Sequence, residues 1–436
     1  MSTFNIKDYG AKPISVSCEP ATAAIQAALD ACRDSGGGRV VVPAGMTFVT
    51  GSITLYGRTD LHFEPGSELR GSECREDYRP FHVGGEYASG DSAFLLEAHG
   101  AEGLSISGSG VIDGRGASFM EGYRSPEGPF IKRPKSWRPR MIGLYGCRRI
   151  SIRDVTLRDA ANWCLHMTGC DDVVVSGIRI LNDLAIPNCD GIDPDHCTNV
   201  RISDCYIESG DDCIVVKATR HGAELGYSGS RDIVVSNCIC VSTSAALKIG
   251  TESHGDFSNI LFQNCVVRGS GRGLAIQLRD GGNVDNVMFA NCAVETRLFH
   301  SLWWGSAEPI YVTALPRNSE TRVGRVRHLR FSNILCRSEN GIFVAGSPDS
   351  PIEDLVLDDV RVEIDAWSRW PGGRQDRRPI LGGEHAGLSE APTDGVYIEN
   401  AAGVRLSGVD VAWGKNRRSH WGDDLRTRDV TGLTVR

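Results

Sequence analysis

The chain has 436 residues, a net charge of −8 at pH 7 and an ordinary composition whose one excess, 51 glycines, suits many tight turns. The negative charge argues against nucleic-acid and anionic-membrane partners, because both bind basic surfaces. No apolar run reaches the roughly 20 residues that span a bilayer, so no membrane partner is expected.

Residues 1–6 contain neither a basic segment nor an apolar core, so no secretory signal is visible there. The 15 cysteines include no CxxC pair and no His/Cys cluster with the spacing of a zinc site. We therefore predict no metal site, reduced thiols and a cytoplasmic location. A secreted protein would follow if a signal had been trimmed from this chain.

Residues 1–60 predict a cap and the first coils of a β-stack. Residues 4–10 indicate a short strand that ends in a glycine turn. Residues 23–33 carry apolar side chains at helical spacing and predict one amphipathic helix. Residues 40–42 and 47–49 are then two strands around a Pro-Ala-Gly turn, so a single helix precedes strands alone.

From residue 104 onward the chain repeats an alternating apolar triplet. The triplets begin at Ile150, Val173, Val200, Ile233, Ile260, Val287 and Leu329, 23 to 42 residues apart with 27 recurring. So irregular a period favours β-coils with loops of varying length over the fixed period of leucine-rich or ankyrin repeats. We predict one all-β domain over residues 1–436, a right-handed parallel β-helix with a short N-terminal capping helix.

Certain residue types recur at fixed distances from the first residue of each triplet. Four residues after it stand Asp204, Asn237, Asn264, Asn291 and Asn333, and five after it stand Cys205, Cys238, Cys265 and Cys292. Three residues before it stand Cys147, Cys170 and Cys197. Identical residues at one phase stack along a parallel helix. We expect amide and thiol ladders inside the coil, with the cysteines acting as small buried apolar residues.

Three polar or aromatic segments interrupt the repeat, at residues 114–139, 297–325 and 366–392. Long loops in a compact repeat are usually functional. We predict that residues 114–139 and 297–325 are insertions on the side of a binding cleft.

Three carboxylates stand out at the centre of the chain. Asp190 and Asp212 are 22 residues apart, about one coil, and Asp211 is adjacent. Stacked on neighbouring strands, they would lie about 4.8 Å apart, where mutual repulsion favours a shared proton. Glycoside hydrolysis needs one protonated acid and one ionised base. The same residues also suit an Asp-rich turn or a calcium site.

At these residues the sequence resembles glycoside hydrolase family 28, the polygalacturonase family. The Asn-Thr-Asp motif of the family appears as Asn188-Cys189-Asp190, and its Gly-Asp-Asp motif as Gly210-Asp211-Asp212. The resemblance implies a pectin-lyase-like solenoid, an oligosaccharide substrate, inversion at the anomeric carbon and no metal or organic cofactor. It implies Asp211 as general acid, with Asp190 and Asp212 holding the water.

Two family motifs are absent. The Gly-His-Gly motif, which supplies a histidine, aligns with Ser244-Ala245-Ala246. The Arg-x-Lys pair, which grips a substrate carboxylate in the family, aligns with Ala275-Ile276-Gln277. The usual galacturonate clamp is therefore missing, which leaves open a hydrolase of a different, neutral glycoside.

Strand phase suggests replacements for the clamp. His166 falls in the column of Asp193 and Lys248, and Lys217 falls five residues after Asp212. The two lysines could meet a substrate carboxylate, or they could be solvated strand residues, and aromatic pairs stack on sugars or simply pack. The substrate-binding candidates are His166, Lys217, Lys248, Glu252, Gln277, Trp303 and Trp304.

We predict an inverting, exo-acting hydrolase of pectin-type oligosaccharides, built on galacturonide or rhamnogalacturonan. Exo-action is inferred from the long insertions and the missing signal. A β-helix polysaccharide lyase using Lys217 or Lys248 as base, and a non-catalytic glycan-binding protein, are the alternatives. The chain is a monomer or a homo-oligomer, with a dimer contact plausible at its uncapped C-terminal coils.

Overall fold

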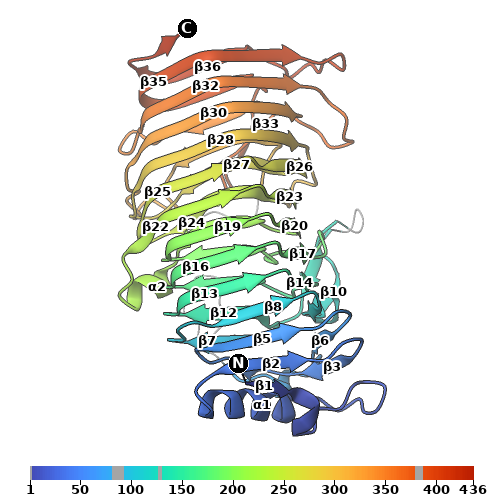
Figure 1. Ribbon diagram of the computed structural model, residues 1–436. Helices are drawn as coiled ribbons and strands as arrows, with labels where there is room; N and C mark the ends of the chain where they lie inside the picture. The colour runs from blue at the N-terminus through green and yellow to red at the C-terminus, as the bar shows by residue number, and fades with distance from the viewer. Residues whose placement is uncertain (1, 81–92, 126–129, 379–385) are drawn as a thin grey trace. The chain divides into compact units, whose positions relative to one another are not determined.

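The computed structural model of the protein describes residues 2–80, 93–125, 130–378 and 386–436. By its contacts the chain divides into two compact units, Met1–Gly210 and Asp211–Arg436. Within each unit the strands run parallel from coil to coil (Figure 1), and the fold is the right-handed parallel β-helix predicted from the sequence. No helix among these residues is long and apolar enough to cross a membrane.

In the N-terminal cap, the predicted helix is confirmed, but the first strand is shorter than predicted. Helix α1 (Thr22–Asp34) buries Ile25, Ala28, Leu29 and Cys32, the apolar side of the predicted helix. Strand β1 (Thr3–Asn5) ends early, because the Asn5 side chain accepts a hydrogen bond from the amide of Lys7 and starts the 3-10 helix η1 (Ile6–Tyr9). The predicted strand over residues 4–10 is therefore wrong after Asn5.

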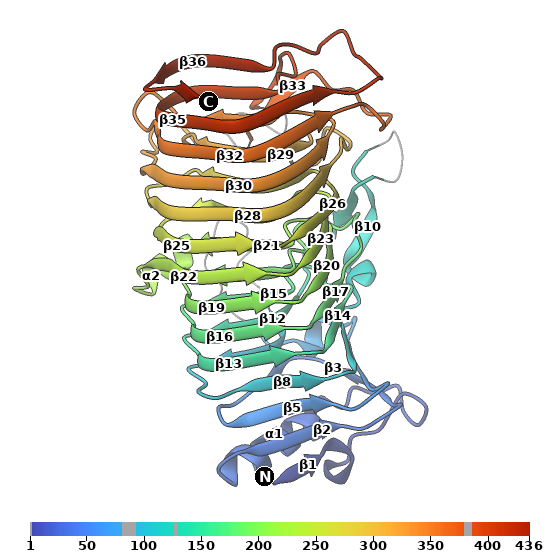
Figure 2. The same ribbon diagram turned by 45° about the horizontal axis from the view of Figure 1, so that its top comes forward.

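The first unit stacks its strands in three columns, one strand of each column per coil (Figure 2). The predicted triplets are confirmed as neighbours, since Ile150 pairs with Val173 and Val173 with Val200. The remaining elements are β2 (Gly38–Val42), β3 (Thr47–Thr50), β4 (Ile53–Thr54), β5 (Thr59–Phe63), β6 (Glu68–Gly71), η2 (Arg75–Asp77), β7 (Phe94–His99), β8 (Ser105–Gly108), β9 (Val111–Asp113), η3 (Gly116–Phe119), β10 (Met120–Tyr123), β11 (Lys132–Pro134), β12 (Arg140–Tyr145), β13 (Arg148–Arg153), β14 (Thr156–Arg158), β15 (Leu165–Thr168), β16 (Asp171–Ser176), β17 (Arg179–Leu181), β18 (Ile192–Asp195), β19 (Thr198–Ser203) and β20 (Tyr206–Ser209).

The second unit continues the pattern with longer strands. Ile233, Ile260, Val287 and Leu329 pair in succession, which confirms the later triplets. Its elements are β21 (Ile214–Ala218), α2 (Arg220–Glu224), β22 (Gly229–Ser236), β23 (Ile239–Ser242), β24 (Ala245–Ser253), β25 (Asp256–Gln263), β26 (Val266–Ser270), β27 (Arg272–Leu278), β28 (Val284–Thr296), β29 (Glu308–Ala314), β30 (Val326–Ser338), β31 (Ile342–Ala345), β32 (Ile352–Ile364), β33 (Arg374–Asp376), β34 (Leu388–Glu390), β35 (Val396–Trp413), β36 (Leu425–Thr431) and β37 (Thr434–Val435).

The two predicted ladders differ in where they lie. The cysteines at the repeated phases are buried, as expected. The amide ladder is exposed instead: Asn291 donates to the side chain of Asn264 at 3.2 Å, and Asn333 donates to Asn291 at 2.9 Å. These three asparagines have φ values of 53° to 54°, a left-handed conformation that asparagine tolerates better than most residues. The ladder therefore marks an outer corner of each coil.

The predicted insertions contain regular structure. Residues 297–325 are not one loop, because they include β29, a strand of the stack that pairs with β27 and β31. Residues 114–139 include η3 and the antiparallel pair β10–β11, and residues 126–129 of that segment lie outside the described residues. Residues 366–392 include the antiparallel pair β33–β34, with residues 379–385 likewise outside the description.

Candidate active site

The chain itself brings the two aspartate motifs together. The Ser209 hydroxyl donates to the carbonyl of Cys189 at 2.5 Å, and the Gly210 amide donates to the Cys189 sulfur at 3.2 Å. A Cβ on Gly210 would lie 2.2 Å from the carbonyl oxygen of Ile186, so only glycine allows this approach. Because Cys189 and Gly210 are in contact, the next residue of each segment is placed beside the other.

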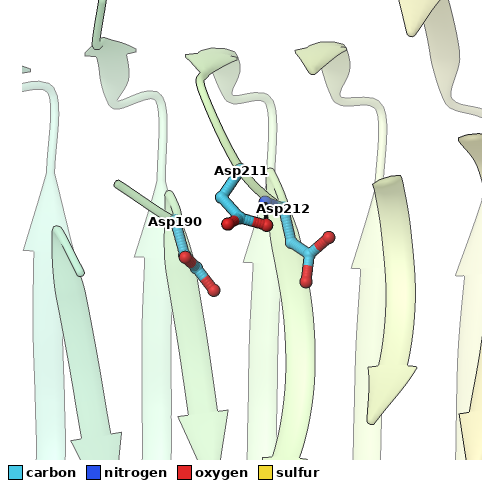
Figure 3. A group of neighbouring side chains, drawn as sticks. All are labelled: Asp190, Asp211 and Asp212. Atoms are coloured by element: carbon cyan, nitrogen blue, oxygen red, sulfur yellow. Dashed lines mark hydrogen bonds between the residues drawn. The ribbon is translucent and has the colours of Figure 1, made fainter. Parts of the chain in front are cut away.

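Those next residues are the predicted catalytic carboxylates. One carboxylate oxygen from each of Asp190, Asp211 and Asp212 lies within 4.8 Å of the other two, and all three residues are buried (Figure 3). The predicted proximity of the three carboxylates is thus confirmed. A group of carboxylates so close is stable only if donors or protons offset the repulsion.

Asp212 is supplied with three donors. Its Oδ1 accepts from the Ser244 hydroxyl at 3.0 Å and from the Ala245 amide at 3.1 Å, and its Oδ2 pairs with Lys248 Nζ at 2.7 Å. Hydrogen bonds and a cation directed at a carboxylate favour its anionic form. Both carboxylate oxygens of Asp212 are therefore engaged by protein donors.

Two of these donors come from the segment that aligns with the family motif containing the missing histidine. Ser244 and Ala245 occupy the positions that align with Gly-His-Gly, and both hold Asp212. Lys248 is 7% exposed and is bound to the same carboxylate. Its role as a substrate-carboxylate clamp stays a prediction, but the contact that it makes is with the candidate catalytic group.

Lys217 and Glu252 form a second buried pair, with Nζ and Oε2 at 3.4 Å. Although burial alone would raise the pKa of Glu252, the charges of Lys217, Arg317 and Lys248 lower it to about 2. Arg317 is itself held by Asp280, at 2.8 Å. The predicted candidates Lys217 and Glu252 thus neutralise each other beside the site.

We expect Glu252→Gln to destabilise the protein in a pH-dependent way. The pKa of Glu252 is lowered from 4.5 to about 2, so its contribution is complete above about pH 4.5 and is lost as the pH falls towards 2. At neutral pH the difference should be about 3 kcal/mol. Denaturant midpoints of both proteins at pH 7, 5 and 3.5 should converge as the pH falls, and a gap independent of pH would contradict this assignment.

Strand register bears out two steps of the predicted column of His166, Asp193 and Lys248. His166 pairs with Asp193, and Val215, three residues after Asp212, pairs with Lys248. Lys217 lies five residues after Asp212 and Gly250 lies five residues after Ala245, so an unbroken register would pair them. They do not pair, because the pairing of β21 with β24 shifts between Val216 and Ala218. The extra residues of β24 in this bulge bring Glu252, rather than Gly250, to Lys217.

His166 is enclosed by protein on both ring nitrogens. Its Nδ1 lies 3.0 Å from a guanidinium nitrogen of Arg140, and its Nε2 lies 3.1 Å from Asp195 Oδ2. Arginine can only donate, so Nδ1 accepts and Nε2 donates to Asp195. With the ring 1% exposed, these contacts indicate a positioning role and do not support the predicted contact with substrate.

Gln277, Trp303 and Trp304 all contact the segment around Arg378. Gln277 donates to the Arg378 carbonyl at 2.5 Å, and Arg378 donates to the Trp303 carbonyl at 2.5 Å. Trp303 is 3% exposed, and the Arg378 guanidinium lies 5.2 Å from the Trp304 ring centroid. Binding of sugar by these residues stays a prediction, and their contacts favour packing.

Sequence analysis missed the buried charge network beneath this segment. Arg272 pairs with Glu308 at 3.2 Å and with Asp376 at 3.4 Å, and Arg378 pairs with Asp376 at 2.8 Å. Burial would raise the pKa of Asp376, but Arg272 and Arg378 lower it to about 2. The one sequence signal was the arginine-rich composition of residues 366–392, since Arg272 and Asp376 are far apart in the chain.

Comparison with known proteins gives a consistent result. The sequence profile of "Glycosyl hydrolases family 28" matches residues 32–370. A probable polygalacturonase from Vitis vinifera is 31% identical over 235 residues, which are 52% of this chain and 46% of that protein. A polygalacturonase from Ralstonia solanacearum is 28% identical over 249 residues, 46% of each chain. The chain therefore spans about half the length of the curated relatives it matches.

Two solved structures share the fold over most of their length. The exopolygalacturonase of Thermotoga maritima has a TM-score of 0.71 at 23% identity, with 83% of this chain and 87% of that chain covered. The family 28 exopolygalacturonase of Yersinia enterocolitica has a TM-score of 0.72 at 18% identity, with 98% and 78% covered. At these identities the likeness establishes the fold.

Proposed function

Because the chain belongs to glycosyl hydrolase family 28, we propose that it hydrolyses the glycosidic bonds of pectin-type oligosaccharides. The observation that carries the proposal is the grouping of Asp190, Asp211 and Asp212, with Asp212 held by three donors. Acid–base hydrolysis needs two carboxyl groups in opposite protonation states close to one bond.

The environments of two of the carboxylates support different roles. Asp212 is bound by Lys248, Ser244 and the Ala245 amide, which suits an ionised base that activates water. Asp211 accepts from the Asp212 amide at 3.0 Å and, in line with the family resemblance, is the general acid. Asp190 then completes the site for the attacking water.

We propose that the enzyme acts from a chain end. The segment Asp376–Arg378 lies on strands β27 and β29, fixed by Arg272 to the Asp376 carbonyl at 3.0 Å, Tyr311 to the same carbonyl at 2.8 Å, and Gln277 to Arg378. In the second unit these strands are two and three coils beyond β21, which begins after Asp212. At about 4.8 Å per coil, we expect a segment fixed at this distance to block a longer chain and to leave room for a short end only.

A neutral glycoside is the second candidate substrate. Both lysines that could replace the missing clamp are bound to carboxylates of the protein, Lys248 to Asp212 and Lys217 to Glu252. A substrate carboxylate would have to compete with these buried pairs. The relatives named as polygalacturonases favour the galacturonide.

Incubation with end-labelled galacturonate oligosaccharides tests the reaction, the direction and the stereochemistry together. We expect release of the terminal sugar with uptake of one water, and a first-formed anomer opposite to that of the substrate by proton NMR. The expectation of inversion rests on the family resemblance and not on the distances. Carboxyl groups in inverting enzymes are commonly about 6.5–9.5 Å apart, whereas those here are closer.

Other outcomes would each overturn a separate part of the proposal. Internal fragments at early times would contradict exo-action, and a retained anomer would contradict inversion. An ultraviolet-absorbing unsaturated product would show a lyase. Turnover of a neutral oligosaccharide of the same length, with none of the galacturonide, would establish the second candidate. Binding without any turnover would leave a glycan-binding protein.

A further inference from the structure

The second unit contains a cavity of about 1040 Å³ that none of the three aspartates lines. It is bounded by the two strands of the β33–β34 pair and by the chain around Trp421. Pockets for small molecules usually measure about 300–1,000 Å³, so this one is large enough for a short oligosaccharide. None of the residues already placed in the active site lines it.

The walls of the cavity are fixed by close packing. A Cβ on Gly373, whose φ is +73°, would lie 2.9 Å from the His420 ring, so glycine is needed for the ring to pack there. The Ala391 amide donates to Gly373, and the Thr393 amide donates to His420. Trp421 is 7% exposed, and its ring centroid lies 5.1 Å from that of Trp413, with the two rings tilted by 33°.

Arg374 is a cation without an ion-pair partner among the described residues. It lines the cavity, and its Nε is buried with no hydrogen-bond partner. In the part of the chain that the structure describes, no ion pair or hydrogen bond engages its guanidinium. The nearby Asp376 is already held by Arg272 and Arg378.

Other charged groups of the cavity are accounted for. Arg426 is bound by Asp394 at 2.8 Å and Asp423 at 2.9 Å. Glu390 stands opposite Arg374 in the β33–β34 register but is exposed and forms no ion pair with it within the described ranges. Burial and Arg418 lower the pKa of His420, so its ring is neutral at pH 7.

We propose that this cavity is an accessory binding site for a uronate-bearing oligosaccharide. An unpartnered guanidinium is suited to a carboxylate, which it binds through two parallel hydrogen bonds. Glu390 and Ser389 offer acceptors to sugar hydroxyls, and Leu388 and Pro392 offer an apolar wall. The choice of ligand rests on the proposed function. An accessory site would keep the oligosaccharide bound to the enzyme between cleavage events.

Titration of an Asp211→Asn variant with trigalacturonate, followed by calorimetry, tests this proposal without turnover. We expect two binding events per chain. Adding Arg374→Met should remove one of them, with affinity lowered about tenfold or more, while Arg374→Lys weakens it less because the charge remains. The exposed Arg417 provides a matched control, and Arg417→Met should leave both events unchanged.

The outcomes separate this proposal from the proposed function. One binding event that is insensitive to Arg374→Met would overturn the accessory site, whether or not the wild-type protein hydrolyses trigalacturonate. Equal binding of a neutral trisaccharide at the Arg374-dependent site would overturn the uronate assignment. Unchanged hydrolysis of trigalacturonate by the Arg374→Met single variant would show that the variant is folded. Failed hydrolysis by the wild type would count against the proposed function alone.

Discussion

Asp211→Asn should lower kcat on the galacturonide substrate by about 10³-fold, with little change in KM. An amide has the shape of the carboxylic acid but cannot deliver its proton, and a positioned general acid contributes typically 10²–10⁴-fold. The acceptor oxygen that receives the Asp212 amide is retained, so the fold around it should persist. Initial rates under saturating substrate, with matching circular dichroism spectra, measure the effect.

A substrate with a good leaving group sharpens the interpretation of Asp211→Asn. Such a leaving group needs no protonation, so an aryl glycoside of the same sugar should recover much of the rate. If instead both substrates lose activity equally, Asp211 is not the acid and its role is that of a base or an orienting group. Full activity of the variant on the natural substrate would contradict the proposed mechanism.

Lys248→Met should cost both stability and activity. The substitution keeps the aliphatic chain but leaves the buried Asp212 carboxylate without the cation now 2.7 Å away. Removing one partner of a buried ion pair costs about 3–5 kcal/mol, which denaturant unfolding would detect.

A double-mutant cycle separates this role from the substrate clamp. In an Asp212→Asn background the charge is already absent, so Lys248→Met should be much less destabilising there. If Lys248 bound the substrate carboxylate instead, the single variant would raise KM at unchanged stability. That result would restore the interpretation of Lys248 as a replacement for the missing clamp.

The sequence predicts those parts of the fold that depend on a short pattern within each coil. The triplet at Ile260 carries its own alternation, and its neighbours repeat it at the same phase, so pairing follows directly. Asp190 and Asp212 were predictable for the same reason, being one coil apart. Strand β29 was missed because all seven of its residues are buried, which removes the alternation that identifies a strand with one exposed face.

The rest of the site depends on contacts that no local pattern records. Asp376 reaches Arg272 from a segment more than 100 residues away, and nothing in either stretch specifies the other. A bulge in β24 shifts the register by which Lys217 had been placed. Positions in an irregular repeat are therefore predictable until the first bulge, and long-range ion pairs are not predictable from phase at all.

The buried cysteines at the repeated positions also affect how readily the protein is oxidised. They stand just before or within successive parallel strands, which lie about 4.8 Å apart. Burial raises the pKa of Cys170 and raises that of Cys292 to about 12. A hydrogen bond with Cys170 instead lowers the pKa of Cys147. Because the thiolate is the reactive form, Cys170 and Cys292 stay protonated, and their burial shields them from oxidants that modify exposed cysteines.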